Sequence, residues 1–186
     1  MPGTDAEFTH VATVRDGRII LNEYFWDHAE ALKAVRLSEY AMSQQYVEMV
    51  RAATEAVKNP EGIERLAHGD LDVTIIDPEI EWDSLRARDL VPDLVDVYWG
   101  HEGVRTYWRR WLEAWRYIEF DIQDIVDADD EIVLLICNQR QWGRHTGIVS
   151  KLPPFALIYT FRDGKVVRFR FFPDHGSALK AVGLTE

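Results

Sequence analysis

Two side chains are the candidates for acid–base chemistry in this sequence. Asp83 ends the strand-like segment EIEWD, and His145 lies in the loop-like segment GRHTG. A carboxylate that faces an apolar cavity has a raised pKa and can exchange a proton near neutral pH, as a histidine does at its ordinary pKa. An aspartate at a strand end, followed by Ser84, is equally typical of a solvated turn. Both readings of Asp83 stay open at this point.

Other reactive groups give little support for metal chemistry. No HxxxH, HExxH or paired-cysteine spacing occurs, so the sequence predicts no metal site and no cofactor. The single cysteine, Cys137, lies in the apolar run EIVLLIC, which excludes an intrachain disulfide and predicts a buried thiol. Arg140, on the segment NQRQW, is an available cation for a ligand.

Large aromatic side chains are the candidates for a substrate-binding wall. A pocket for a flat molecule could be lined by Trp82, Tyr98, Trp108, Trp111, Trp142 and Tyr159. A stripe at helical spacing, such as Trp108 and Trp111, is also typical of an ordinary core. Trp82 and Asp83 are neighbours in a strand and point to opposite faces, so only one of them can face the cavity.

These side chains need helices and strands to hold them. Ser43 can cap a helix that begins at Met42 and ends at Asn59-Pro60, and a second helical piece follows. Asp77-Pro78 predicts a break before the strand EIEWD, and residues 84–100 have the irregular pattern of a lid, a binding loop or a disordered excursion.

The rest of the chain has clear periodicity. Residues 100–115 form an amphipathic helix pattern with the aromatic residues on one face. Strand patterns then follow at 117–126, 131–142, 154–161 and 165–172. Helices followed by a run of antiparallel strands indicate an α+β fold, in which helices cover one face of a curved sheet.

Charge and length limit the choice of partners. The chain has 186 residues, and its 32 acidic against 21 basic residues give a formal charge of −11. A field of that sign repels nucleic acids and anionic lipid surfaces, so we expect neither as a partner. No apolar run reaches membrane-spanning length and the N-terminus has no signal-peptide pattern, which favours a cytoplasmic location.

An internal repeat accounts for the N-terminus. An offset of 147 positions aligns residues 7–39 with 154–186, and 15 of the 33 pairs are identical where chance gives about two. Each copy predicts a hairpin with an Arg-Asp-Gly turn and a helix that starts near Asp-His. We interpret residues 1–41 as a partial duplicate of the C-terminal hairpin and helix, and residues 42–186 as the complete domain. Because His28 repeats His175, the Asp-His pair is more typical of a helix cap than of catalysis.

Several motifs occur in the order of a known family: MSQQYVEMVRAATEAV, LDVTIIDPEIEW, GHEGVRTYWRRWLEAW and FRDGKVVRFRFFPDHGSALKAVGL. With them, residues 42–186 resemble a SnoaL-like protein of the nuclear transport factor two-like superfamily, whose relatives include polyketide cyclases, ketosteroid isomerases and limonene epoxide hydrolases. The resemblance implies a cystatin-like conical barrel, three helices packed on a curved, mainly antiparallel sheet, with an apolar cavity and a homodimeric assembly. The repeat adds a hairpin-helix arm before it.

The resemblance also implies a role for Asp83, at the place where ketosteroid isomerases carry their proton-transferring Asp. The isomerase oxyanion donors are missing, because their places correspond to Thr54 and Leu157; Tyr159 is a substitute donor. Three hypotheses follow. The first is a pocket for a small apolar ligand with proton transfer by Asp83, leading to cyclisation or isomerisation. The second is a non-catalytic binding or assembly module, favoured if Asp83 points away from the pocket. The third is an epoxide hydrolase, which needs two carboxylates around Arg140.

Overall fold

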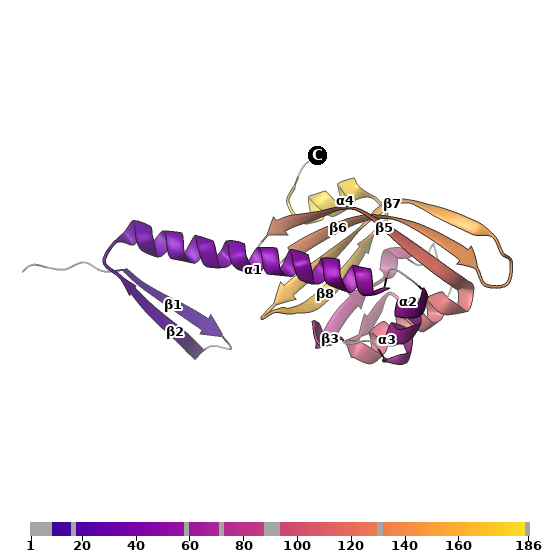
Figure 1. Cartoon of the computed structure of the whole chain (residues 1–186), viewed down its shortest axis with the longest axis horizontal. Helices are drawn as coiled ribbons and strands as arrows, with labels where there is room; N and C mark the ends of the chain where they lie inside the picture. The colour runs from indigo at the N-terminus through magenta and orange to yellow at the C-terminus, as the bar shows by residue number, and fades with distance from the viewer. Residues whose placement is uncertain are drawn as a thin grey trace, which may run out of the picture. The chain divides into compact units, whose positions relative to one another are not determined.

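The chain forms two compact units, residues 1–44 and 45–186. Figure 1 shows the computed structural model, which describes residues 9–15, 18–57, 60–70, 73–87, 94–129 and 132–184. The boundary lies three residues beyond the one expected from the repeat. The origin of the first unit as a partial duplicate stays a prediction.

The first unit contains the expected hairpin. Strands β1 (Thr9–Arg15) and β2 (Arg18–Phe25) pair in a two-stranded antiparallel sheet, and helix α1 begins at His28. The Asp27 carboxylate accepts a hydrogen bond from the backbone N–H of Ala29 at 2.7 Å, which caps the helix start. The predicted hairpin and helix start are confirmed. The tip of the predicted Arg-Asp-Gly turn, residues 16 and 17, lies outside the described residues.

Helix α1 is longer than the sequence predicts. It runs without interruption from His28 to Val57, so the prediction of a separate helix that begins at Met42 with Ser43 as its cap is wrong. The C-terminal copy explains why. Gly183 has a φ of +76° just beyond helix α4 (His175–Ala181), a conformation that ends helices, and the equivalent position in the first copy is Arg36. With no stop signal at Arg36, the helix continues.

A six-stranded sheet forms the frame of the second unit. Its strand order is β4-β3-β8-β7-β6-β5, and every neighbouring pair is antiparallel except β3 with β8. The strands are β3 (Ile76–Asp83), β4 (Val97–Trp99), β5 (Trp115–Asp129), β6 (Ile132–Gly143), β7 (Val149–Arg162) and β8 (Lys165–Phe172). The four predicted C-terminal strands are confirmed, with β8 at its predicted bounds.

One local expectation needs correction, and another falls partly outside the described residues. Asp77-Pro78 does not break the chain but lies inside β3, where the pairing with β8 is irregular between Ile76 and Glu81 and the missing N–H of proline is tolerated. The segment 84–100 contains a short 3-10 helix, Leu85–Ala87, and strand β4; residues 88–93 lie outside the described residues.

The turn between β7 and β8 follows from its sequence. Asp163 and Gly164 have φ values of +51° and +76°, and Arg162 pairs directly with Lys165. Positive φ at both central residues is the geometry of a type I′ hairpin turn, which Asp-Gly favours.

Helices lie on both faces of this sheet. Helix α2 (Pro60–His68) begins at a proline, which suits a first helical turn, and α3 (Gly100–Ala114) carries the aromatic stripe. Along β7, Ile158 packs against the small C-terminal helix α4, which lies across the sheet from α2 and α3 in Figure 1. Tyr159, the next residue, belongs to the opposite face and the main core.

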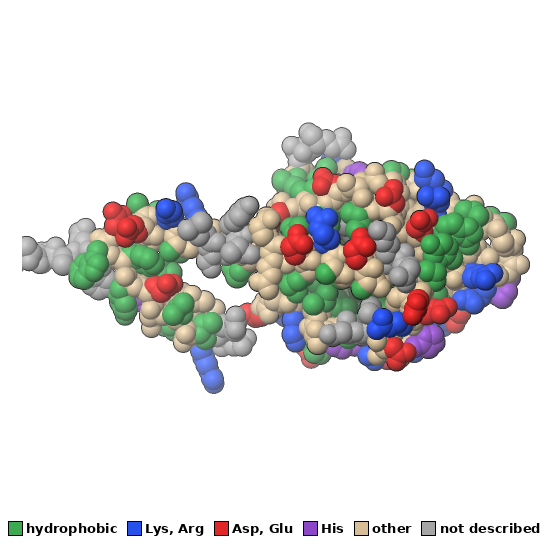
Figure 2. Space-filling model, in the orientation of Figure 1, with side chains coloured by type: hydrophobic (Ala, Val, Ile, Leu, Met, Phe, Trp, Pro, Cys, Tyr) green, Lys and Arg blue, Asp and Glu red, His purple; other side chains and the backbone are tan. Residues whose placement is uncertain are grey.

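Charged side chains lie on the outside of the domain. Figure 2 shows acidic and basic groups interspersed on one face. Ion pairs of the domain include Arg168 with Glu81 at 2.8 Å and Arg110 with Glu113 at 3.3 Å. Within the described ranges, no helix is both long and apolar enough to cross a membrane. Every buried polar side chain in the described part of the chain is uncharged.

Candidate functional site

The candidate site is a cavity of about 390 Å³ between the helices and the sheet of the second unit. Helix α1 contributes Met49 and Ala53, α2 contributes Leu66, and α3 contributes the aromatic stripe. The sheet closes the other side, with residues from β3, β5, β6, β7 and β8. Prominent among the lining residues are Ile80, Trp82, Tyr107, Trp108, Trp111, Phe120, Gln139, Leu157, Tyr159, Phe169 and Phe171.

One end of the cavity is a cluster of three aromatic residues, Trp82, Tyr107 and Trp108, which we call the aromatic cluster. The Trp82 ring lies 5.5 Å from the Tyr107 ring and 6.4 Å from that of Trp108, between centroids, and Tyr107 and Trp108 are 5.2 Å apart. Phe169 stacks on Trp82 at 3.8 Å and fixes its plane. These contacts hold the rings in place, so the wall is formed in advance of binding.

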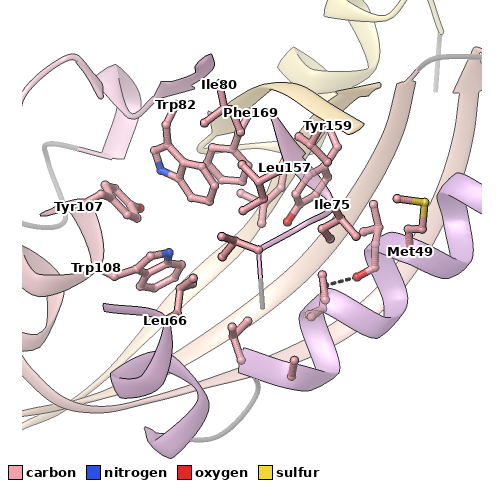
Figure 3. Close-up of a pocket in the computed structure, with 18 of the residues that line it drawn as sticks. Met49, Leu66, Ile75, Ile80, Trp82, Tyr107, Trp108, Leu157, Tyr159 and Phe169 are labelled. Carbon is pink, nitrogen blue, oxygen red and sulfur yellow. Dashed lines mark hydrogen bonds between the residues drawn. The ribbon is translucent and has the colours of Figure 1, made fainter. Parts of the chain in front are cut away.

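Two polar groups in the lining already have protein partners. The Thr54 hydroxyl donates a hydrogen bond to the carbonyl of Val50 at 2.8 Å, one turn earlier in α1, and Figure 3 marks this bond. The side-chain amide of Gln139 donates to the Gln141 side chain at 2.7 Å. Both groups are thus satisfied by the fold, at least in part, and neither is an ionisable group.

Two tyrosines present hydroxyl groups to the cavity. In Figure 3, Tyr107 and Tyr159 point their oxygens into the cavity from opposite sides, from α3 and β7 respectively. Burial raises the pKa of both hydroxyls well above the ordinary tyrosine value; at Tyr107 the nearby Trp111 indole acts in the opposite direction. Each phenol is therefore neutral and retains its proton for donation.

Asp83 does not line this cavity. Its neighbour Trp82 faces the cavity, and strand alternation turns Asp83 to the other face of β3. There its carboxylate accepts a hydrogen bond from the backbone N–H of Leu85 at 3.1 Å, as in an Asx turn. Arg170 lies directly opposite Asp83 in the register of β8 with β3. Burial, and after it the charge of Arg168, lowers the pKa of Arg170, whereas the charge of Asp83 raises it.

Four further predicted site residues lie outside the cavity lining. His145 is exposed in the turn after β6, beside a shallow surface depression, and the Arg140 guanidinium lies 3.4 Å from the Glu119 carboxylate. Trp142 packs on Tyr117 with ring centroids 4.4 Å apart. Tyr98 is buried, and its hydroxyl accepts a hydrogen bond from the backbone N–H of Val95.

The remaining four, Trp82, Trp108, Trp111 and Tyr159, are brought together in the lining. Sequence reasoning did not select Tyr107 as a site residue, although it belongs to the same helical stripe as Trp108 and Trp111. It also missed Gln139, whose period-two relation to the buried Cys137 and Gln141 is a detectable signal. The prediction of a buried thiol at Cys137 is confirmed, and burial raises its pKa.

The lining is neutral. Among the described residues, no Asp, Glu, His, Lys or Arg lines this cavity. An apolar wall with a few neutral hydrogen-bonding groups suits a small organic molecule, and its volume lies in the range of ligand pockets. The described lining residues therefore provide no carboxylate or imidazole as a general base.

Comparisons with known proteins match the fold. The family model described as the SnoaL-like domain matches residues 61–169. No curated protein matches the chain in sequence. Similar solved structures include TerC co-crystallized with polyporic acid, which is 16% identical, covers 76% of this chain and 98% of its own, and has a TM-score of 0.53.

Two further structures are similar. An NTF2-like protein from Anabaena variabilis ATCC 29413 is 13% identical and covers 72% of this chain and 90% of its own, with a TM-score of 0.52. Bal32a, from a soil-derived mobile gene cassette, is 16% identical and covers 70% of this chain and 89% of its own, with a TM-score of 0.50. At such low sequence identities, these structures show a similar fold and nothing more. The predicted α+β fold of the nuclear transport factor two-like kind is confirmed.

Proposed function

The chain belongs to the SnoaL-like domain family, and we propose that its cavity binds a small, largely apolar molecule without proton transfer by Asp83. The observation that carries this proposal is the neutral, mainly apolar lining of a cavity of about 390 Å³. Transfer of apolar surface from water into such a site is favourable, whereas a charged ligand would lose its hydration without gaining a counter-ion. The position of Asp83 favours the binding hypothesis over the cyclase or isomerase hypothesis.

An epoxide hydrolase mechanism has less support still. It requires carboxylates around Arg140 and a water molecule. Arg140 is exposed, its ion-pair partner is Glu119, and neither lines the cavity. The described cavity lining therefore gives no support to an epoxide hydrolase mechanism.

Binding can be tested with N-phenyl-1-naphthylamine, a neutral probe whose fluorescence rises in an apolar environment. We expect the full chain to bind it. The variant Ala53→Leu places extra carbon atoms in the cavity and should weaken binding about tenfold, which corresponds to a steric cost of about 1.4 kcal/mol. Ala181→Leu, an equivalent change at an exposed position of α4, is the matched control and should bind like the parent protein. Failure of the parent protein to bind, or equal binding by Ala53→Leu, would overturn the proposal.

The role of Asp83 has a separate test. Asp83→Asn should leave probe affinity within about twofold of the parent value, because the side chain lies outside the lining and the Asn carbonyl can still accept from Leu85. Any turnover found for the protein should also survive this change. Loss of turnover with unchanged probe affinity would instead return Asp83 to a catalytic role.

A further inference from the structure

Three indole N–H groups of the cavity lining, those of Trp82, Trp108 and Trp111, have no acceptor among the described residues, and the first two belong to the aromatic cluster. Trp82 is 6% exposed and Trp108 is 8% exposed, and neither Nε1 atom has a hydrogen-bond partner in the described part of the chain. An indole nitrogen can only donate, and a buried donor without a partner destabilises the protein that contains it. A molecule that brings an acceptor into the cavity would remove this penalty.

These donors belong to the aromatic cluster, whose third member adds another. Figure 3 shows the Trp82 and Trp108 nitrogens and the Tyr107 hydroxyl at the same end of the cavity. Because burial keeps the Tyr107 phenol protonated, its hydroxyl can also donate. Three neutral donors thus lie close together, whereas Tyr159 approaches alone from the opposite side.

Few other groups of the lining could supply the missing acceptor. The Thr54 hydroxyl and the Gln139 side-chain N–H donate to Val50 and Gln141, and the oxygens of Thr54 and Gln139 make no hydrogen bond with the indole nitrogens. No described carboxylate lines the cavity. The aromatic cluster therefore has an excess of donors. A protonated amine or an alkyl ligand would leave that excess in place, and a carboxylate would be buried without a counter-ion.

We propose that the bound molecule is an uncharged ring compound with a carbonyl oxygen, and that this oxygen accepts hydrogen bonds from the aromatic cluster. This inference rests on the proposed binding function and adds the chemical class and the orientation of the ligand. The rings of the ligand occupy the apolar part of the cavity, between Leu157, Phe171 and the α1 side chains. The carbonyl group points toward Trp82, Tyr107 and Trp108.

The test uses two probes with the same carbon skeleton, 1-tetralone and tetralin, of which only the first has a carbonyl. Affinities come from displacement of N-phenyl-1-naphthylamine, and the carbonyl stretch of ¹³C-labelled tetralone is read by infrared spectroscopy. Hydrogen bonding lowers that frequency, so we expect it to lie below its value in cyclohexane. Trp108→Phe and Tyr107→Phe should each raise the frequency and weaken tetralone binding about three- to tenfold, while tetralin affinity changes less than twofold.

Two controls separate hydrogen bonding from packing. Replacement of Trp108 by 3-benzothienylalanine keeps the ring shape but removes the N–H group, so it should reproduce the Trp108→Phe frequency even if Trp108→Phe folds poorly. Tyr159→Phe removes the hydroxyl on the opposite side and should leave the frequency unchanged. The inference is overturned if the frequency equals that in cyclohexane, or if Tyr159→Phe shifts it and the cluster variants do not. If tetralin also fails to bind, the proposed function fails with it.

Discussion

Residues 9–35 and 156–182, the two copies of the repeat, have the same local structure in very different surroundings. The strand pairing is irregular between Thr13 and Val14 in one copy and between Thr160 and Phe161 in the other, 147 positions later. The helix that follows is capped in both by an aspartate, Asp27 or Asp174. Bulge and cap are thus encoded by residues within each copy.

The two copies differ in how deeply their equivalent side chains are buried. The helix alanine is buried in both, with Ala31 at 1% and Ala178 at 0% exposure. On the strands, however, Val14 is 59% exposed while Phe161 is fully buried. Strands β7 and β8 are flanked by β6 and β3, whereas β1 and β2 form a sheet of two. A hairpin and a cap can therefore be specified locally, but the core that stabilises them requires neighbouring strands.

The largest expected effect is the loss of a buried ring. Phe161→Ala should lower the free energy of unfolding by about 3 to 5 kcal/mol, because it removes a fully buried side chain and leaves a void. The equivalent change in the first copy, Val14→Ala, should cost less than about 0.5 kcal/mol, as expected for an exposed position. Urea denaturation followed by circular dichroism measures both. Similar losses would mean that Val14 is covered in solution.

A second test exchanges the helix stop. Gly183→Arg should destabilise the domain by about 1 to 2 kcal/mol, because its φ of +76° suits glycine and the surrounding space is open, so only backbone strain is added. The reverse change, Arg36→Gly, puts a glycine inside α1 and should reduce the helical signal at 222 nm. An unchanged signal would show that more than one glycine is needed to end the helix there.

These differences mark how far the sequence predicts the structure. Strand β8, the Asp163-Gly164 turn and the helix start at Asp27 follow from short-range patterns, and all were predictable. The continuation of α1 through Met42 was not predicted, because it depends on a glycine that is missing and not on a residue that is present. The absence of a helix-ending residue is harder to recognise in a sequence than its presence.

In the candidate site, too, short-range patterns predict some features and tertiary packing decides the others. Alternation predicts that Trp82 and Asp83 face opposite ways, but it cannot say which one faces the cavity; the packing of Phe169 on Trp82 decides that. Arg140 and Trp142 are on a correctly predicted strand, yet they lie outside the cavity lining. Gln139, which lines the cavity, has a polar side chain that composition alone places at the surface.

The smallest effect concerns the two caps. The Ser177 backbone and hydroxyl donate to the Asp174 carboxylate at 2.8 and 2.7 Å, and these bonds hold the pKa of Asp174 below its ordinary value. Asp174→Ala should lower the thermal midpoint of the domain by about 2 to 4 °C at pH 7. Because the folded-state pKa is depressed, the stabilisation is present above the unfolded-state pKa, about 3.9, and is lost as pH falls through the folded-state value. The two melting curves should therefore converge in acid.

Two variants show whether the caps act locally. Asp174→Asn keeps an acceptor for the Ser177 N–H but does not titrate, so its midpoint should stay close to that of the parent protein at pH 7. Asp27→Ala removes the other cap, at the start of α1 in the first unit, and should reduce helical signal without moving the midpoint of the domain. If Asp27→Ala lowers that midpoint as much as Asp174→Ala does, the two units unfold together, and the stability of the first copy is not independent of the second.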